Sequence, residues 1–302
     1  MILSLRDISK SFGEKQVLKG ISLSARGGRA LGLLGRNGAG KTTAIRLIMD
    51  IFPPDSGKVL LDGMPPAQSG VTIGYLPEER GLYLKKQVLE QLVYFAGLKG
   101  MPRRAAREAA MALLERVGLS EYAGSKLETL SKGNQNKVQL VATLVGDPQI
   151  LILDEPFSGL DPVNAALLKE LVRECVSRGK IVFFSSHQMN YIEEFCDEIA
   201  ILNGGKIVLS GGIREIKHHY DRSRLVIEGA DQERLASFAR EQDGLVKDLQ
   251  RKGSGALLKL AAPERKNELI SALLAQGVEF EGVRVFEPSL SDIFVEYTEG
   301  GI

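Results

Sequence analysis

The chain has 302 residues, of which 44% are hydrophobic and 25% charged. This composition excludes a disordered chain, and the length predicts one domain of ~200 residues with a smaller one of ~80. Because 39 basic residues face 38 acidic ones, the net charge of +1 gives no overall field for holding nucleic acid or an anionic membrane.

The sequence contains no signal for secretion or for crossing a membrane. No window reaches the ~18 consecutive apolar residues of a spanning helix. The N-terminus meets the charged residues Arg6 and Asp7 before an apolar stretch of signal-peptide length forms. Cys175 and Cys196 lack metal-ligand spacing. We therefore expect a cytosolic protein that would serve a membrane from one side.

The first 62 residues predict strands followed by a helix. Apolar and polar residues alternate over 3–8 and 17–23, which favours two paired strands with one solvated face. Residues 30–34 are almost all apolar, as in a parallel strand covered on both faces. A helix is expected over 43–49, and another strand over 58–62 after a turn rich in proline and glycine.

The middle of the chain predicts a helical insertion and then a parallel sheet. Helical spacing runs from 85 to 122. The apolar runs 150–153, 181–184 and 199–202 alternate with helical stretches, which is the rhythm of βαβ units. Asn203-Gly204-Gly205 then predicts a hairpin into a strand at 206–209.

The rhythm changes after about residue 222 to strand, helix, strand, strand, helix, strand. This order predicts a small ferredoxin-like α+β domain. The expected elements cover 225–228, 232–240, 246–250, 257–260, 264–276 and 280–286.

Residues 35–42, Gly-Arg-Asn-Gly-Ala-Gly-Lys-Thr, match the phosphate-binding pattern GxxxxGK[ST]. Glycines let consecutive backbone N–H groups approach phosphate oxygens, and the next helix offers its positive end. A chance match is possible among 33 glycines, but the apolar strand before and the helix after are the required context. The expected nucleotide contacts are Gly35, Asn37, Gly38, Ala39, Gly40, Lys41, Thr42 and Thr43.

A second chemical element is the acidic pair Asp154-Glu155, which directly follows the apolar run 150–153. A buried strand that ends in two carboxylates places one near a Mg²⁺ ion held by Thr42, and the next where it polarises an attacking water. One acid alone would more often mark a strand reaching solvent. The phosphate-binding loop makes the catalytic interpretation the better one.

The segment Leu130-Ser131-Lys132-Gly133-Asn134-Gln135 precedes a helix upstream of Asp154 and resembles the signature motif of ABC ATPases. A helix N-terminus suits phosphate binding. The resemblance implies that Ser131, Gly133 and Asn134 cap the γ-phosphate of a nucleotide held by the other subunit.

Other family markers follow in the expected order. Phe12 resembles the aromatic that stacks on adenine, Ser158-Gly159-Leu160-Asp161 the loop that meets the partner subunit, and His187 the switch histidine that contacts the γ-phosphate. Without the neighbouring motifs, Phe12 would be interpreted as a core or edge aromatic, and His187 as a hydrogen-bonded structural histidine. His218 and His219 have no such support and are interpreted as solvated linker residues.

Three positions depart from the family pattern. Glu78 stands where the family usually has glutamine, and we expect its carboxylate still to serve the metal. Lys132 and Asn134 replace a glycine and a glutamine of the signature, while Ser131 and Gly133 keep the expected backbone donors.

The resemblance implies an α/β fold: a P-loop NTPase with a RecA-like parallel core, an antiparallel β subdomain and a helical insertion at about 85–130. The nucleotide-binding domain is expected over 1–215, and a ferredoxin-like α+β accessory domain over 222–302. The tail 287–294 resembles ATPase subunits of drug- and sodium-exporting systems of the type-2 export class, which points to export.

The family mechanism implies ATP and Mg²⁺ as ligands, with Mg²⁺ on Thr42, Asp154 and Glu78. Glu155, His187 and Lys41 are then the catalytic residues. One motor domain per chain implies a homodimer or a paralogous partner, working with a separate multi-span permease and no nucleic acid. The accessory domain is expected to support the dimer, with regulation as the alternative.

Two rival functions are weaker. ABC ATPases that act on ribosomes or DNA usually carry a second motor domain, a coiled coil or a zinc module, and the sequence shows none of these nor a basic stripe. A nucleotide sensor without hydrolysis is disfavoured because Glu155 and His187 are both present. The transported substrate is left open.

Overall fold

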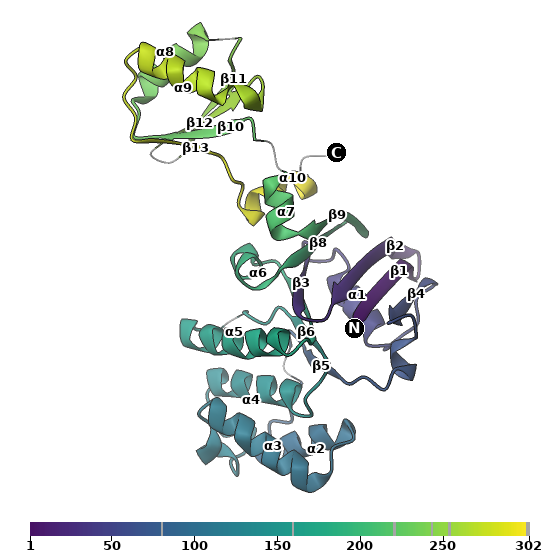
Figure 1. The fold of residues 1–302 in the computed structure, drawn as a ribbon. Coiled ribbons are helices and arrows are strands. Elements are labelled where there is room, and N and C mark those ends of the chain that lie inside the picture. Colours follow the sequence, from purple (N-terminus) through teal and green to yellow (C-terminus); the bar gives the residue numbers. More distant parts are fainter. Residues whose placement is uncertain (80, 159, 220–221, 243, 253–254, 300–302) are drawn as a thin grey trace. The chain divides into compact units, whose positions relative to one another are not determined.

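The computed structural model describes residues 1–79, 81–158, 160–219, 222–242, 244–252 and 255–299 (Figure 1). Two positions of predicted motifs, Arg80 beside Glu78 and Gly159 in the partner-facing loop, lie outside the described residues. Contacts divide the chain into one unit of Met1–Ile213 with Ile293–Ile302, and a second of Arg214–Asp292.

An antiparallel sheet opens the first unit, with the strand order β2-β1-β4. Its strands are β1 (Ile2–Phe12), β2 (Lys15–Arg26) and β4 (Ser56–Leu61). Leu3, at the centre of β1, lies opposite Ala25 on one side and Leu61 on the other, and all three are buried. The predicted pairing of the first two strands is confirmed.

The second sheet of this unit has the order β5-β6-β7-β3-β8-β9. Its strands are β3 (Arg29–Leu34), β5 (Ile73–Leu76), β6 (Ile150–Asp154), β7 (Ile181–Ser186), β8 (Glu198–Asn203) and β9 (Lys206–Gly212). Five strands are parallel, and β9 returns antiparallel to β8. Gly204 and Gly205, at φ 55° and 82°, make the predicted tight turn between them.

Helices follow the strands of this sheet as the βαβ rhythm requires (Figure 1). They are α1 (Lys41–Ile48), α5 (Pro162–Ser177) and α6 (Met189–Phe195), with a short turn at Pro66–Gln68. The start of α5 is fixed by its sequence: Asp161 accepts a hydrogen bond from the Asn164 backbone N–H at 2.9 Å, and Pro162 occupies the first helical position.

The helical insertion contains α2 (Val88–Leu98) and α3 (Arg103–Arg116), which pack on each other and on α4 (Lys132–Leu144). Single turns lie at Ser120–Tyr122 and Leu127–Thr129. Ala106, Ala110 and Leu114 are fully buried at spacings of four, so α3 shows one apolar face to the other helices. The predicted helical insertion is confirmed.

One apolar core joins the two sheets of the first unit and α1. Leu5 of β1, Leu33 of β3, Ile45 of α1 and Phe183 of β7 are each at most 1% exposed. Burial of such side chains contributes roughly 1.5–3 kcal/mol each. The core therefore fixes the end of β3 and the start of α1, between which the phosphate-binding motif lies.

The second unit has the predicted ferredoxin-like order. Its elements are β10 (Arg224–Glu228), α8 (Gln232–Glu241), β11 (Val246–Lys252), β12 (Gly255–Leu260), a turn at Pro263–Arg265, α9 (Lys266–Ala275) and β13 (Gly282–Val285). The sheet runs β11-β12-β10-β13, and all its pairs are antiparallel. Leu235, Phe238, Leu269 and Leu273 pack the two helices onto it.

Two helices lie where the units meet along the chain, α7 (Ile213–His218) and α10 (Leu290–Glu299). The end of α10 belongs to the first unit, where the Tyr297 carbonyl accepts a hydrogen bond from Asn203 Nδ2 at 3.3 Å and Glu299 pairs with Arg36. Among the described residues, none of the helices has the length and apolar character that crossing a membrane requires.

Candidate functional site

The phosphate-binding motif forms the loop between β3 and α1. Gly38 and Gly40 have φ of 80° and 111°, a region that L side chains rarely adopt. A Cβ on Gly35 would lie 2.7 Å from the Leu202 carbonyl oxygen, and one on Gly40 2.8 Å from Leu18. The loop thus requires glycine at these positions, as expected for a backbone that wraps a phosphate closely.

Lys41 is held inside this loop at the first position of α1. Its ammonium donates to the Gly35 carbonyl at 2.7 Å and lies 3.8 Å from Glu155 Oε1. The residue is only 7% exposed. A positive side chain and the positive end of α1 therefore coincide at one point, which favours an anion there. Thr42 and Thr43 follow on α1, both half-buried.

Asp154 ends β6 and is 3% exposed. Its Oδ1 accepts a hydrogen bond from Ser185 Oγ of the neighbouring strand β7, and its Oδ2 accepts one from the Tyr75 hydroxyl of β5 at 3.4 Å. Burial, and secondly the negative charge of Asp154, raise the pKa of Tyr75 to about 12. Both neighbouring strands therefore orient this carboxylate.

Glu155 follows with a backbone φ of 48°, which is strained for a residue other than glycine. Its N–H donates to the Ser185 carbonyl at 2.9 Å, which holds the turn. Ser186 Oγ donates to Oε2 at 2.9 Å, and His187 Nδ1 lies 2.8 Å from Oε1. The carboxylate of Glu155 is thus buried, and Ser186 and His187, at and just after the end of β7, fix its position.

These groups fit a magnesium nucleotide. Mg²⁺ is usually held by one or two carboxylates, a hydroxyl or water, and phosphate oxygens rather than by a cage of protein side chains. Asp154 and Thr42 supply such oxygen donors beside the loop that Lys41 occupies. Over the described ranges no three His, Cys, Asp or Glu side chains form a metal-binding group, so the phosphates would complete the coordination.

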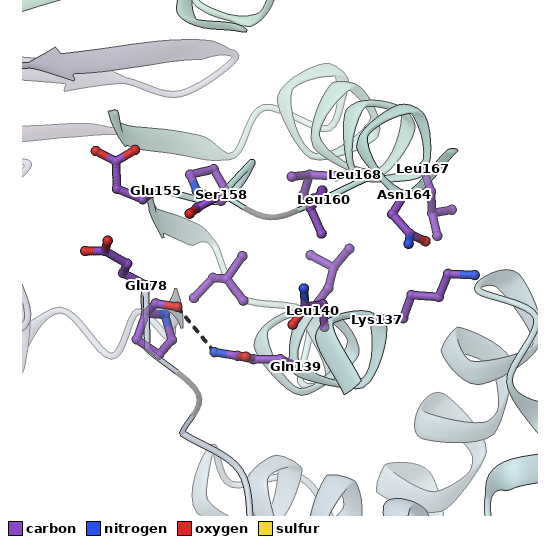
Figure 2. A pocket seen from close by; sticks show the side chains of 14 residues that line it. Glu78, Lys137, Gln139, Leu140, Glu155, Ser158, Leu160, Asn164, Leu167 and Leu168 are labelled. Atoms are coloured by element: carbon purple, nitrogen blue, oxygen red, sulfur yellow. Dashed lines mark hydrogen bonds between the residues drawn. The ribbon is translucent and has the colours of Figure 1, made fainter. Parts of the chain in front are cut away.

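Glu78 follows β5 and is exposed. It lines a pocket between the end of β5, α4 and α5, where its carboxylate and that of Glu155 project to the same side (Figure 2). The pocket is lined by Leu76, Pro77, Glu78, Asn136, Lys137, Gln139, Leu140, Glu155, Pro156, Ser158, Leu160, Asn164, Leu167 and Leu168.

The signature segment begins α4 and is more open. Ser131 caps the helix by accepting a hydrogen bond from the Asn134 N–H at 3.2 Å, and it is exposed. A Cβ on Gly133 would meet the Asn164 amide at 3.2 Å, so the signature adjoins the start of α5. Within the part of the chain that the structure describes, no hydrogen bond or ion pair joins Ser131 to Lys41 or Glu155.

Phe12 ends β1 and is 50% exposed. Its ring meets the Phe52 ring edge to face, with centroids 5.5 Å apart, and the Lys10 ammonium lies 5.8 Å from its centroid. Lys10 is itself fixed by Asp55 at 2.8 Å. The structure therefore keeps a large aromatic side chain at the surface, where a planar base can stack on it.

Comparison with known proteins agrees with this geometry. Residues 18–158 match the family model described as ABC transporter, and residues 211–298 match that of the C-terminal domain of DrrA1-3-like ATP-binding proteins. The chain is 40% identical over 299 residues to the uncharacterized ABC transporter ATP-binding protein YhaQ of Bacillus subtilis, and the match covers 98% of each chain. The chain belongs to the ABC transporter ATP-binding proteins.

Further relatives add detail to this assignment. The ABC subunit is 32% identical to a Nod factor export ATP-binding protein I of a Rhizobium species, over 98% of this chain and 96% of that one. A solved structure described as the ATP binding subunit of an ABC transporter is 28% identical, with a TM-score of 0.68, and covers 73% of this chain and 93% of its own. The chain is an ATPase subunit coupled to transport, and the comparisons give no support to the ribosome or DNA alternative.

Sequence reasoning missed three groups of this site. The sequence motifs give no role to Ser185 and Ser186, although they are polar residues at the end of a fully buried strand, at 0% and 1% exposure. Buried hydroxyls need partners, and that need could have pointed to the carboxylates. Tyr75 gave no signal because its strand, β5, was not predicted.

Proposed function

We propose that two copies of this subunit, or one copy and a paralogue, pair head to tail and drive a separate membrane permease. Each ATP would lie between the phosphate-binding loop of one subunit and Ser131, Gly133 and Asn134 of the other. The observation that carries the catalytic part of the proposal is the cluster at the end of β6, where the buried Lys41 Nζ and the exposed His187 Nδ1 lie 3.8 Å and 2.8 Å from the buried Glu155 Oε1.

Glu155 is the proposed residue that orients or deprotonates the attacking water. Its carboxylate is buried and held by Ser186 and His187, so its position is set before substrate arrives. Preorganised groups of this kind act without reorganisation cost at the moment of reaction. With Nδ1 of His187 directed to Glu155, the second ring nitrogen is the atom left for a γ-phosphate oxygen.

Asp154, Thr42 and Glu78 are proposed to serve Mg²⁺. The ion would neutralise charge on the β- and γ-phosphates. Asp154 is suited to this task because Ser185 and Tyr75 orient its two oxygens. Glu78 adds a carboxylate from the pocket of Figure 2, on the same side as Glu155. Lys41 and the loop amides would hold the phosphates, and Phe12 the adenine.

The shared site is supported by the exposure of the signature. The Ser131 side chain is exposed, and among the described residues its hydroxyl bonds only to the Asn134 N–H of the same helix start. A helix N-terminus without a ligand in its own subunit suits an anion presented by a second one. We place the assembly at the cytoplasmic face of the membrane, held there by the permease.

Export is the proposed direction, supported by the similarity to the Nod factor export ATP-binding proteins of Rhizobium. We assign the accessory domain, proposed over residues 222–302, to dimer support, with regulation as the alternative. Its residues 225–285 include an apolar core of their own. The nucleotide-binding domain itself is assigned to residues 1–215.

The direct test of the catalytic assignment is Glu155→Gln. This change keeps the size of the side chain and removes the carboxylate, so steady-state ATP turnover should fall at least ~100-fold. Affinity for ATP, measured by equilibrium binding of a fluorescent analogue, should stay within about threefold. A variant with turnover close to that of the unmodified protein would overturn the assignment.

A further inference from the structure

Gln139 of α4, a side chain with no role assigned so far, binds the backbone of residues 77–79, here called the Glu78 loop. This residue lies eight positions after Ser131 and is 7% exposed. Its amide nitrogen lies 3.3 Å from the Pro77 carbonyl oxygen and 3.2 Å from that of Glu79, and it donates to both. The two accepting residues flank Glu78, and Figure 2 shows the bond to Pro77.

A second side chain on the same face of α4, Thr143, also contacts this part of the chain. Thr143, four residues after Gln139, places its hydroxyl 3.2 Å from the Tyr75 carbonyl oxygen. β5 is the edge strand of its sheet, so carbonyls on its outer side lack a neighbouring strand. The same hydroxyl lies 2.9 Å from the Gln139 carbonyl oxygen, so its single proton has two acceptors. The two bonds donated by Gln139 are therefore the main side-chain link from α4 to the chain that follows β5.

The chain beyond Glu78 is also tied to the segment before the signature. The Leu84 carbonyl accepts a hydrogen bond from Glu128 N–H at 2.9 Å, and the Lys86 carbonyl accepts one from Leu127 N–H at 3.1 Å. Residues before and after Glu78 are thus hydrogen-bonded to α4 or to the turn that precedes it. The Glu78 side chain itself is exposed.

We infer that Gln139 is a positioning residue for ATP hydrolysis, which fixes Glu78 relative to Glu155 and joins it to the signature helix. The inference rests on the proposed function, in which Glu78 serves the metal and Ser131 caps the partner's nucleotide. Because Ser131 and Gln139 share one helix, movement of the signature against the partner's ATP displaces Glu78 in the subunit's own site.

The test is a double-mutant cycle between Gln139→Met and Glu78→Ala. Methionine has a similar length and no donor, so the Pro77 and Glu79 carbonyls lose their partner. We expect Gln139→Met to lower kcat about tenfold, since small misplacements of site groups have effects of this size or larger. It should also raise the Mg²⁺ concentration for half-maximal turnover, as Glu78→Ala should.

The cycle separates positioning from general destabilisation. If Gln139 acts through Glu78, the double variant should be within about twofold of Glu78→Ala, because groups acting as a unit are not additive. Multiplicative losses in kcat, an unchanged Mg²⁺ requirement in Gln139→Met, or a Glu78→Ala variant with full activity would each overturn the inference.

Gln135 provides the matched control. It lies one turn earlier on α4, is also buried, and donates its amide to the Leu127 and Leu130 carbonyls at 3.2 Å and 2.9 Å. Gln135→Met removes a similar pair of bonds, both of them to the segment just before α4, so its effect should multiply with that of Glu78→Ala. Should Gln139→Met not fold, Gln139→Asn, which withdraws the amide by one methylene, carries the same cycle.

Failure of this inference is distinguishable from failure of the proposed function. If Glu155→Gln abolishes turnover while the Gln139 cycle is multiplicative, the catalytic assignment stands and only the positioning role falls. If Glu155→Gln retains turnover, the proposed function falls whatever the cycle gives.

Discussion

The catalytic end of β6 and the signature end of α4 differ in how many parts of the chain hold them. Asp154 and Glu155 are buried and bonded by side chains from β5, β7 and the turn after β7. Ser131 is exposed and its hydroxyl bonds only to the next turn of its own helix among the described residues. One half of the site is assembled within the chain, and the other half is presented outward, as a site shared between two subunits requires.

Blocking the exposed half should have the largest effect. Ser131→Arg adds a bulky side chain where the partner's γ-phosphate is proposed to lie, so ATP turnover should fall at least ~100-fold. Binding of ATP to the monomer should change little, because the phosphate-binding loop is untouched. Steady-state turnover and equilibrium binding measure the two quantities.

Ser120→Arg is the matched control, since Ser120 is an exposed serine in the helical insertion that packs on α4. It should leave turnover within about twofold. Loss of ATP binding to the Ser131→Arg monomer would mean that Ser131 contacts the nucleotide of its own chain. The signature would then not be presented to a second subunit.

Removing one hydrogen bond to the buried Glu155 carboxylate should have an intermediate effect on ATP turnover. Ser186→Ala removes the hydroxyl that donates to Glu155 Oε2 at 2.9 Å and leaves a buried carboxylate oxygen without that donor. We expect kcat to fall about tenfold, equivalent to ~1.4 kcal/mol, with KM for ATP nearly constant.

Ser177 provides the comparison for this change, because its hydroxyl donates to the Glu174 carbonyl at the exposed end of α5. Ser177→Ala should leave kcat unchanged. An effect of Ser186→Ala on KM alone would show that Ser186 acts on ATP binding rather than on the water-orienting carboxylate.

The smallest predicted effect concerns the C-terminal end of α4. A lysine side chain binds the carbonyls there, whereas Ser131 at the start of the helix is exposed. Lys99 donates to the Thr143 and Val145 carbonyls, each at 2.9 Å, and burial lowers its pKa to about 8. Between pH 8 and about 10.5 the unfolded chain keeps the proton that the folded chain has released. The Lys99 contribution to the free energy of unfolding therefore rises with pH in this window.

Denaturant unfolding of the native protein and of Lys99→Met at pH 7.5 and 9.5 measures this contribution. The difference between the two proteins should shift by about 1–2 kcal/mol in favour of the native protein at the higher pH. A difference that does not depend on pH, or one that shifts in favour of the variant, would contradict the assignment.

Much of this architecture could be predicted because its signals are local. The phosphate-binding loop, the acidic pair after 150–153 and the signature at a helix start are each written in consecutive residues. β5 was missed because it has four residues and a glycine, Gly74, in its interior. That glycine is needed since a Cβ there would lie 2.5 Å from the Thr143 carbonyl oxygen, a contact made by residues 69 positions away.

The network around the carboxylates could not be predicted for the same reason. Ser185 reaches Asp154 across 31 residues, and Gln139 reaches Pro77 across 62. Such pairs depend on which strands become neighbours and on how α4 lies along β5, and no pattern within a short window encodes that. The types of residue in the site were predictable, whereas their partners were not.

The central claim, that two chains share each ATP, is tested most directly by the solution mass of Glu155→Gln with and without Mg²⁺ and ATP. Light scattering after size exclusion should show a monomer without nucleotide and a dimer at saturating ATP. The same protein carrying Ser131→Arg as well should stay monomeric. A Glu155→Gln protein whose mass does not change at saturating ATP would contradict the shared site.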